Sequence, residues 1–201
     1  MPLQQAMAYL TGLAGLAVFW IVLLIATKKH PWSLVVGQDG EPSTSKFQML
    51  VWTAAVVFAF LAIFQIRFSS GYWQELPGLP TNLLIAMGIS VVTAVSAKSI
   101  AVKTASVPYA AAPSGKSGIF SNDSGQPDLG KVQVVLWTAI AVGVFLSEVF
   151  ATIQNPGAPH FDAKLGRCVW DLGLPDIGQT LMILMGLGHG AYLGKKIAED
   201  N

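Results

Sequence analysis

Long runs of apolar residues, rather than amphipathic spacing, constrain the fold of this chain most strongly. Hydrophobic residues make up 53% of its 201 residues and charged residues only 11%, less than half of the roughly 25% that is usual for soluble domains. Each run is close to the ~20 residues that a helix needs to cross ~30 Å of hydrocarbon. We expect an all-α integral membrane protein with five transmembrane helices, over Tyr9–Ala26, Phe47–Ile66, Asn82–Val102, Val132–Ile153 and Ile177–Gly194.

A fifteen-residue pattern occurs twice in the chain, at residues 40–54 and 125–139. With a constant offset of 85, Gly, Pro, Lys, Gln, Trp, Thr and Ala coincide in the two copies. Each copy leads into one apolar run, and a second run follows that begins near Leu-Pro and contains Met-Gly. We therefore expect an N-terminal anchor helix and two helical hairpins that are parallel repeats. The predicted units are residues 1–30 (anchor), 31–103 (repeat 1), 104–124 (a cytoplasmic loop) and 125–198 (repeat 2).

Basic residues are distributed unevenly between the two sides of the predicted helices. Nine lysines fall on the side of the C-terminus and of the loops after the first and third helices, whereas the other side has Arg67, Lys164 and Arg167. Loops rich in Lys and Arg stay in the cytoplasm, so we expect the N-terminus outside and the C-terminus in the cytoplasm. The first run is an anchor rather than a signal peptide, because its basic pair Lys28-Lys29 follows the apolar segment.

The repeated pattern places the same polar and aromatic residues at the cytoplasmic start of two helices. Its lysine lies at the inner interface, near anionic headgroups, after a helix start that Ser43 or Asp128 can cap. Its glutamine needs a partner on a neighbouring helix, and its tryptophan follows four residues later on the same face. Two interpretations stay open: helix packing with interfacial anchoring, or an anion or ligand site. The residues are Lys46, Gln48 and Trp52 in the first copy and Lys131, Gln133 and Trp137 in the second.

Small residues recur at helical spacing in several of the apolar runs. In the fifth run glycines are spaced four residues apart, which lets a second helix approach closely. Thr11 and Gly15 form a weaker version of this pattern in the first run. The partner helix can belong to the same chain or to another subunit, and we expect a homo-oligomer. The glycines of the fifth run are Gly186, Gly190 and Gly194.

Two polar residues inside the predicted helices differ between the copies and are the best candidates for a functional role. Glu148 corresponds to Ile63, and His189 corresponds to Val91. A carboxylate inside a span usually faces a pore, a proton path or the bundle interior. The alternative is a hydrated residue near the interface, or a pair with Arg67. His189 is either a hydrogen-bonded packing residue or functional; a direct relay to Glu148 is not expected, because their depths differ by ~10–15 Å.

One stretch of the sequence resembles a known group of proteins. The run Ser-x-Ser-Lys-x-Gln-x-x-x-Trp-Thr, from Ser43 to Thr53, and the later Met87-Gly88-Ile89-Ser90 are similar to stretches in uncharacterised bacterial multi-span inner-membrane proteins. The resemblance covers about half of the chain across both copies. It implies a location in the bacterial inner membrane and no particular activity. The second copy departs from it, with Gly130 and Gly188 at two of the serine positions.

The sequence favours two functions over catalysis. It shows no paired catalytic residues, no cofactor motif, no metal-ligand spacing and no basic patch for nucleic acid. We therefore expect no enzyme, no cofactor and no nucleic-acid partner. The first hypothesis is a self-assembling, channel-like protein of the lipid bilayer. The alternative is a membrane anchor or scaffold that recruits a soluble partner through the cytoplasmic loops at 28–46 and 103–131.

Overall fold

The computed structural model describes residues 3–28, 30–36, 42–73, 75–88, 118–121 and 126–199, and these are mostly helical. The long helices are α1 (Leu3–Thr27), α2 (Thr44–Ser69), α4 (Leu129–Gln154) and α5 (Gln179–Glu199). Residues 81–88 are also helical, and the 3-10 helix η1 spans Pro31–Leu34. Two antiparallel strands, β1 (His160–Asp162) and β2 (Arg167–Val169), form a hairpin between α4 and α5.

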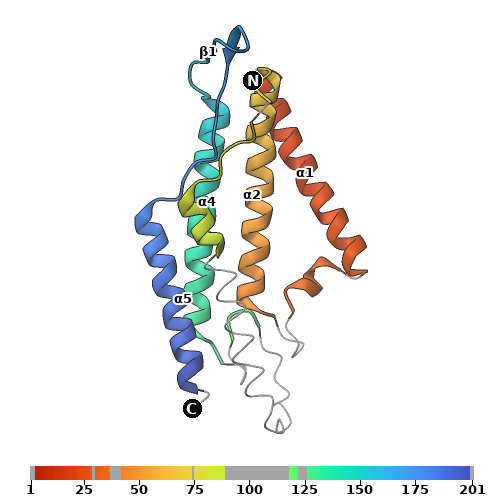
Figure 1. Cartoon of the computed structure of the whole chain (residues 1–201). Coiled ribbons are helices and arrows are strands. Elements are labelled where there is room, and N and C mark those ends of the chain that lie inside the picture. Colours follow the sequence, from red (N-terminus) through yellow and green to blue (C-terminus); the bar gives the residue numbers. More distant parts are fainter. Residues whose placement is uncertain are drawn as a thin grey trace.

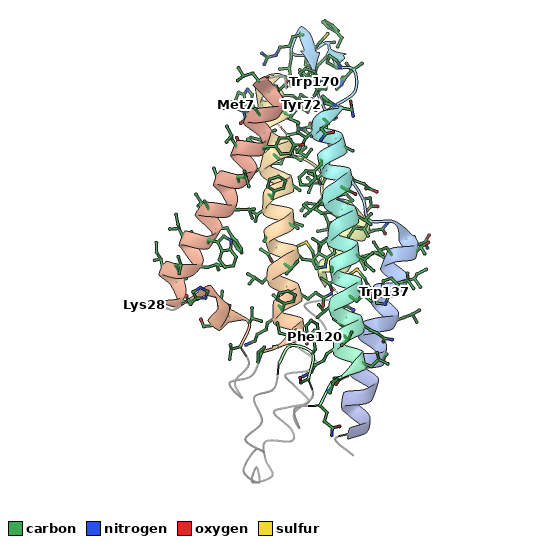
Figure 2. The ribbon with its side chains drawn as sticks, turned by 180° about the vertical axis from the view of Figure 1, so that it is seen from behind. Met7, Lys28, Tyr72, Phe120, Trp137 and Trp170 are labelled. Carbon is green, nitrogen blue, oxygen red and sulfur yellow. The ribbon has the colours of Figure 1, made fainter. Side chains whose placement is uncertain are left out.

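Helix α2 lies at the centre of the bundle, between α1 and α4, and α5 runs alongside α4 (Figure 1). The N-terminus and the β1–β2 hairpin lie at one end, which we call the hairpin end. The C-terminus lies at the opposite end, which we call the C-terminal end. Helix α1 contacts α2 near the hairpin end and diverges from it toward the C-terminal end, as both views show (Figure 1, Figure 2).

The core between α2 and α4 combines small side chains with aromatic rings. Ala55, Ala59 and Ala62 of α2 are buried, and such small residues let helices approach closely. The rings of Trp52 and Phe145 meet with their centroids 6.0 Å apart. Much of the other apolar surface is exposed: only 6% of the apolar window of α1 is buried inside the chain. That exposure is expected of a helix surrounded by lipid.

Helices α1, α2 and α4 are the three helices of the described chain that are long and apolar enough to cross a membrane. They coincide with the first, second and fourth predicted spans, in agreement with the predicted membrane protein. The fifth predicted span corresponds to α5, which begins at Gln179 rather than at Ile177. Of the third predicted span, residues 82–88 are helical. Residues 89–102 of that span and residues 104–117 of the predicted loop lie outside the described residues.

The segment between α4 and α5 contains a hairpin, so the fold is not all-α as predicted. Asp162 stands opposite Arg167 in the strand register. Its Oδ1 accepts hydrogen bonds from the backbone N–H groups of Lys164 (2.8 Å) and Leu165 (3.2 Å). Gly166 ends the turn at φ +62°, a left-handed conformation that favours glycine. Asp-x-x-x-Gly turn chemistry, rather than an apolar pattern, produces this hairpin.

An extended segment precedes the helix at 81–88, and another precedes α5. Both contain the tripeptide Gly-Leu-Pro, beginning at Gly78 and at Gly173. The two segments meet where the Leu174 N–H donates to the Gly78 carbonyl (3.3 Å). Nearby, Asn82 Nδ2 donates to Asp176 Oδ2 (2.9 Å). These contacts join the segment before residues 81–88 to the segment before α5, and α5 begins part-way along α4 rather than at its hairpin end (Figure 1).

Candidate functional site

The loops that enter α2 and α4 are closed in the same way, 85 residues apart. The Lys46 ammonium donates to the Val36 carbonyl (2.7 Å), and the Lys131 ammonium donates to the Ser121 carbonyl (2.6 Å). In each loop an isolated β-bridge pairs the same acceptor residue with the proline of the repeated pattern. One of the three N–H donors of each ammonium binds a loop carbonyl, and two donors remain for the water or anionic headgroups that were expected to contact these lysines. The repeated lysine therefore closes the loop before its helix.

The N-caps of the two helices differ. Asp128 Oδ1 accepts from the N–H groups of Gly130 (2.8 Å) and Lys131 (3.4 Å) at the start of α4. Ser43 occupies the equivalent position before α2, but its side chain makes no cap hydrogen bond. The predicted side-chain cap is therefore present at α4 and not at α2.

This difference predicts unequal costs for two matched substitutions. We expect Asp128→Ala to lower the free energy of unfolding by about 1 kcal/mol, the typical cost of losing an N-cap. Ser43→Ala removes no cap bond and should change it by less than about 0.5 kcal/mol. Unfolding of the two variants in detergent, followed by circular dichroism, measures both values. Equal losses would contradict the assigned difference between the caps.

Gln48 and His189 connect α2 to α5 inside the bundle. His189 Nε2 lies 2.7 Å from Gln48 Oε1, and His189 Nδ1 lies 2.6 Å from the Met185 carbonyl oxygen. Only 1% of Gln48 and 3% of His189 are exposed. The predicted hydrogen bond from Gln48 to another helix is therefore confirmed, and its partner is the histidine that differs between the copies. Neither ring contact goes to Glu148.

Two buried N–H groups next to this pair have no acceptor within the part of the chain that the structure describes: Gln48 Nε2 and Trp52 Nε1. Residues four apart lie on one face of a helix. Long side chains on a helix lean toward its N-terminus, so the Trp52 indole is expected on the side of the turn that carries Gln48. Leaving a buried donor unsatisfied costs about 1–3 kcal/mol. We call His189, Gln48 and Trp52 the histidine cluster.

The second copy of the pattern gives its residues a different environment. Gln133 and Trp137 are only partly buried. Trp137 lies where α4 and α5 meet (Figure 2), and a Cβ on Gly188 would be 3.5 Å from its Cδ1. The position that matches His189 in repeat 1 is Val91, which lies outside the described residues and has no titratable group. The second glutamine therefore has no equivalent histidine.

The closest helix contacts are made by Gly12 and Gly15 of α1 rather than by the glycines of α5. Helix α1 approaches α2 at Gly12, where a Cβ would lie 2.7 Å from the Phe58 ring, and at Gly15, where it would lie 2.0 Å from Leu61 Cδ1. Gly15 belongs to the weaker predicted pattern. A Cβ on the glycines of the stronger pattern would have no described atom within 4 Å, so these glycines make no tight contact within the described chain: Gly186, Gly190 and Gly194.

Arg67, in the last turn of α2, joins three segments at the hairpin end and is 2% exposed. Its Nη1 donates to the Leu172 carbonyl (2.8 Å) and lies 2.9 Å from Asp171 Oδ1, while Nη2 donates to the Glu75 carbonyl (3.1 Å). The suggested pair with Glu148 is wrong, because the extended segment before α5 brings Asp171 against the end of α2 instead. Arg67 thus joins the end of α2 to Glu75 and to the segment before α5.

Tyr72 completes this group, and Figure 2 shows it near Trp170 at the hairpin end. Arg67 Cζ lies 4.7 Å from its ring centroid, within the range of a cation–π contact. The Tyr72 hydroxyl donates to Glu75 Oε2 (3.2 Å). Desolvation, and then the Asp171 and Glu75 carboxylates, raise the pKa of the Tyr72 phenol. The phenol therefore stays protonated and keeps its role as a donor near neutral pH.

Glu148 lies on the exposed face of α4. No described group forms a hydrogen bond or ion pair with its carboxylate, and its backbone carbonyl accepts from the Thr152 hydroxyl (2.9 Å). It stands six residues before Gln154, where α4 ends, or about 9 Å from that end. The neighbours on this face are apolar or small. We define the Glu148 face as Leu136, Ile140, Val144, Ser147, Glu148 and Ala151, all exposed.

No protein-family model, curated protein or solved structure matches this chain. Three groups of side chains are placed by the fold: the histidine cluster, the Arg67 group and the Glu148 face. Sequence reasoning singled out Gln48, His189 and Glu148 but missed Asp171 and the carbonyls that hold Arg67 and the repeated lysines. Every residue has a backbone carbonyl, so the sequence does not indicate which carbonyls Arg67, Lys46 and Lys131 bind.

Proposed function

We propose that this protein is a non-enzymatic subunit of a homo-oligomer in the inner membrane of a bacterium, and that the oligomer surrounds a water-filled passage for cations. The Glu148 face of α4 lines this passage. The observation that supports the proposal is the exposed Glu148 carboxylate, which has no partner in the described chain although α4 is long and apolar enough to span a membrane.

The energetic argument concerns what Glu148 contacts. A carboxylate at the centre of a bilayer costs about 2.5–3.5 kcal/mol even on the mildest scales. About 9 Å inside the end of α4, Glu148 is shallower than this, but contact with lipid tails is still unfavourable. Water between subunits removes that cost, and carboxylates facing a pore favour cations.

Other sides of α4 contact helices of the same chain, and none of the described helices covers the Glu148 face. Phe145 of α4 packs against Trp52 of α2, and Trp137 of α4 packs against Gly188 of α5. Helix α1 reaches α4 near the hairpin end, where the Tyr9 and Phe150 ring centroids are 5.9 Å apart. The Glu148 face is the side of α4 that these contacts leave exposed, and a second subunit is the neighbour that completes it.

The proposed orientation puts the C-terminal end in the cytoplasm. Lys28, Lys46 and Lys131 lie at this end (Figure 2 labels Lys28), as the preference of basic loops for the cytoplasm requires. At the hairpin end, Arg67 and Arg167 are engaged by protein groups: Arg67 as described above, and Arg167 through the Gly71 carbonyl (2.8 Å).

Cysteine accessibility tests whether the Glu148 face meets water. In a Cys168→Ser background, which removes the exposed native thiol, we expect Val144→Cys and Ile140→Cys to react with a membrane-impermeant, charged thiol reagent. These positions lie one and two turns deeper than Glu148, so interfacial hydration alone does not reach them. Ile21→Cys, on the exposed side of α1, should stay unreactive because lipid covers it. Protection at both α4 positions would contradict a water-filled passage along this face.

Ion flux tests the role of the carboxylate itself. A charge ~4 Å from a cation in water contributes about 1 kcal/mol, so Glu148→Gln should lower the preference for cations over anions about fivefold in reconstituted vesicles. Glu75→Gln, at the hairpin end, is the matched control and should leave the preference unchanged. Wild-type protein that is monomeric in mild detergent and passes no ions would contradict the proposal and favour the scaffold alternative.

A further inference from the structure

The histidine cluster has more acceptors around the imidazole than a neutral ring can serve. Both ring nitrogens of His189 face oxygen atoms, the Met185 carbonyl at 2.6 Å and Gln48 Oε1 at 2.7 Å. A neutral imidazole has one N–H, whereas an imidazolium has two. With the Gln48 amide in this orientation, only the protonated ring donates to both oxygens.

A neutral ring requires the opposite orientation of the Gln48 amide. With the amide turned over, Gln48 Nε2 donates to the unprotonated His189 Nε2, while His189 Nδ1 still donates to the Met185 carbonyl. Turning the amide also moves Oε1 to the side away from the ring, toward the expected position of the Trp52 indole. This orientation supplies a partner for Gln48 Nε2 and offers an acceptor to Trp52 Nε1, the two buried donors of the cluster that otherwise have none.

We propose that the histidine cluster is a proton-binding site with two hydrogen-bonded states. In the protonated state His189 donates to Gln48 Oε1, and the Trp52 indole has no acceptor in the cluster. In the neutral state one proton has left His189 Nε2, and the hydrogen bonds run from Trp52 through Gln48 to His189 and Met185. The proton is exchanged with water at the C-terminal end of the bundle, where α2 begins, because Gln48 is four residues from Thr44, or about 6 Å.

No charged side chain among the described residues contacts the His189 ring. On α2 the nearest is Lys46, which holds the Val36 carbonyl. On α4, Lys131 holds the Ser121 carbonyl, and Glu148 lies toward the hairpin end. Among the described side chains no ion pair to His189 is formed. Protonation of the His189 ring on α5 therefore sets the orientation of the Gln48 amide on α2.

This inference goes beyond the proposed passage, since it concerns contacts inside one chain and does not depend on self-assembly. The test is nuclear magnetic resonance of the full-length protein in detergent, with ¹⁵N-labelled histidine and tryptophan, from about pH 5 to 8. We expect the His189 ring to change between two N–H groups and one, and the Trp52 indole proton to shift with the same midpoint. Trp170, at the hairpin end, where its indole donates to the Gly157 carbonyl (3.1 Å), should not follow this midpoint.

His189→Gln is the matched variant, because glutamine still forms hydrogen bonds but does not titrate. The Trp52 indole signal should then become independent of pH. If this variant does not fold, the wild-type His189 signals are identified with His30→Gln and His160→Gln, two exposed positions. A His189 ring that keeps one protonation state over the whole range would overturn the proposal, and so would a titrating ring with an unchanged Trp52 signal.

Discussion

Arg67→Leu is expected to lower the free energy of unfolding by about 3 kcal/mol or more, because it removes a buried charge that ties three segments together. The substitution leaves the Leu172 and Glu75 carbonyls without their donor and Asp171 without its ion-pair partner. The segment before the helix at 81–88 and the segment before α5 should then become more mobile. Unfolding in detergent measures the loss, and limited proteolysis at residues 155–178 reports on the segment before α5.

Arg167→Leu is the matched control for this prediction. Arg167 is exposed, lies at the same end and donates to one described carbonyl, that of Gly71 (2.8 Å), so its loss should cost less than about 1 kcal/mol. Arg67→Lys keeps the charge but cannot reach three acceptors with a planar fork, and an intermediate loss is expected. Equal losses for the two leucine variants would show that Arg67 is not the tie we infer.

The parts of this fold that the sequence predicted are those set by long-range patterns. Unbroken apolar runs gave α1, α2 and α4, because only a helix satisfies its own backbone in lipid. A glutamine inside a span needs a partner on another helix, and Gln48 has one in His189, although the sequence did not name that residue. Both inferences rest on the cost of unsatisfied polar groups, a cost that does not depend on details of packing.

The parts that the sequence did not predict depend on where an irregular backbone lies. Leu-Pro is expected near the start of the second helix in each repeat; the helix at 81–88 does begin directly after Pro80, whereas Leu174 lies in the segment before α5, five residues before α5 begins at Gln179. That segment carries Asp171 to Arg67, which is why the pairing of Arg67 with Glu148 failed. The loop carbonyls that bind Lys46 and Lys131 could not be predicted either, because their positions follow from β-bridges rather than from residue type.

The groups placed by the fold have separate roles along the bundle. The Arg67 group holds the segments after α2 and before α5 at the hairpin end, through two backbone carbonyls and the Asp171 carboxylate. The histidine cluster connects α2 to α5 nearer the C-terminal end, through an imidazole ring, the side chain that most often changes charge near neutral pH. A change of protonation at His189 is therefore expected to alter the half of the bundle nearer the C-terminal end, while the hairpin end stays unchanged. Glu148, on the exposed face of α4, is outside both ties and is free to serve contacts between subunits.

The contact between α1 and α2 depends on the absence of a side chain at Gly12. A Cβ there would lie 2.7 and 2.8 Å from two Phe58 ring atoms and 3.1 Å from the Phe58 carbonyl oxygen. The ring has some freedom to move, but the backbone carbonyl does not, so a larger residue must push α1 away. Near this contact, Gln4 Nε2 donates to Ser69 Oγ (2.7 Å), which holds the start of α1 against the end of α2.

Gly12→Val is therefore expected to destabilise the protein by about 1–3 kcal/mol, the usual cost of overpacking, and to separate α1 from α2. Gly143→Val on α4 carries the same change of residue type, but no described atom lies within 4 Å of a Cβ there, so it isolates the effect of close contact. In a Cys168→Ser background, disulfide formation between Gln4→Cys and Ser69→Cys should fall markedly with Gly12→Val and stay unchanged with Gly143→Val. Similar cross-linking and similar unfolding free energies for the two valine variants would mean that α1 does not rely on Gly12 to pack against α2.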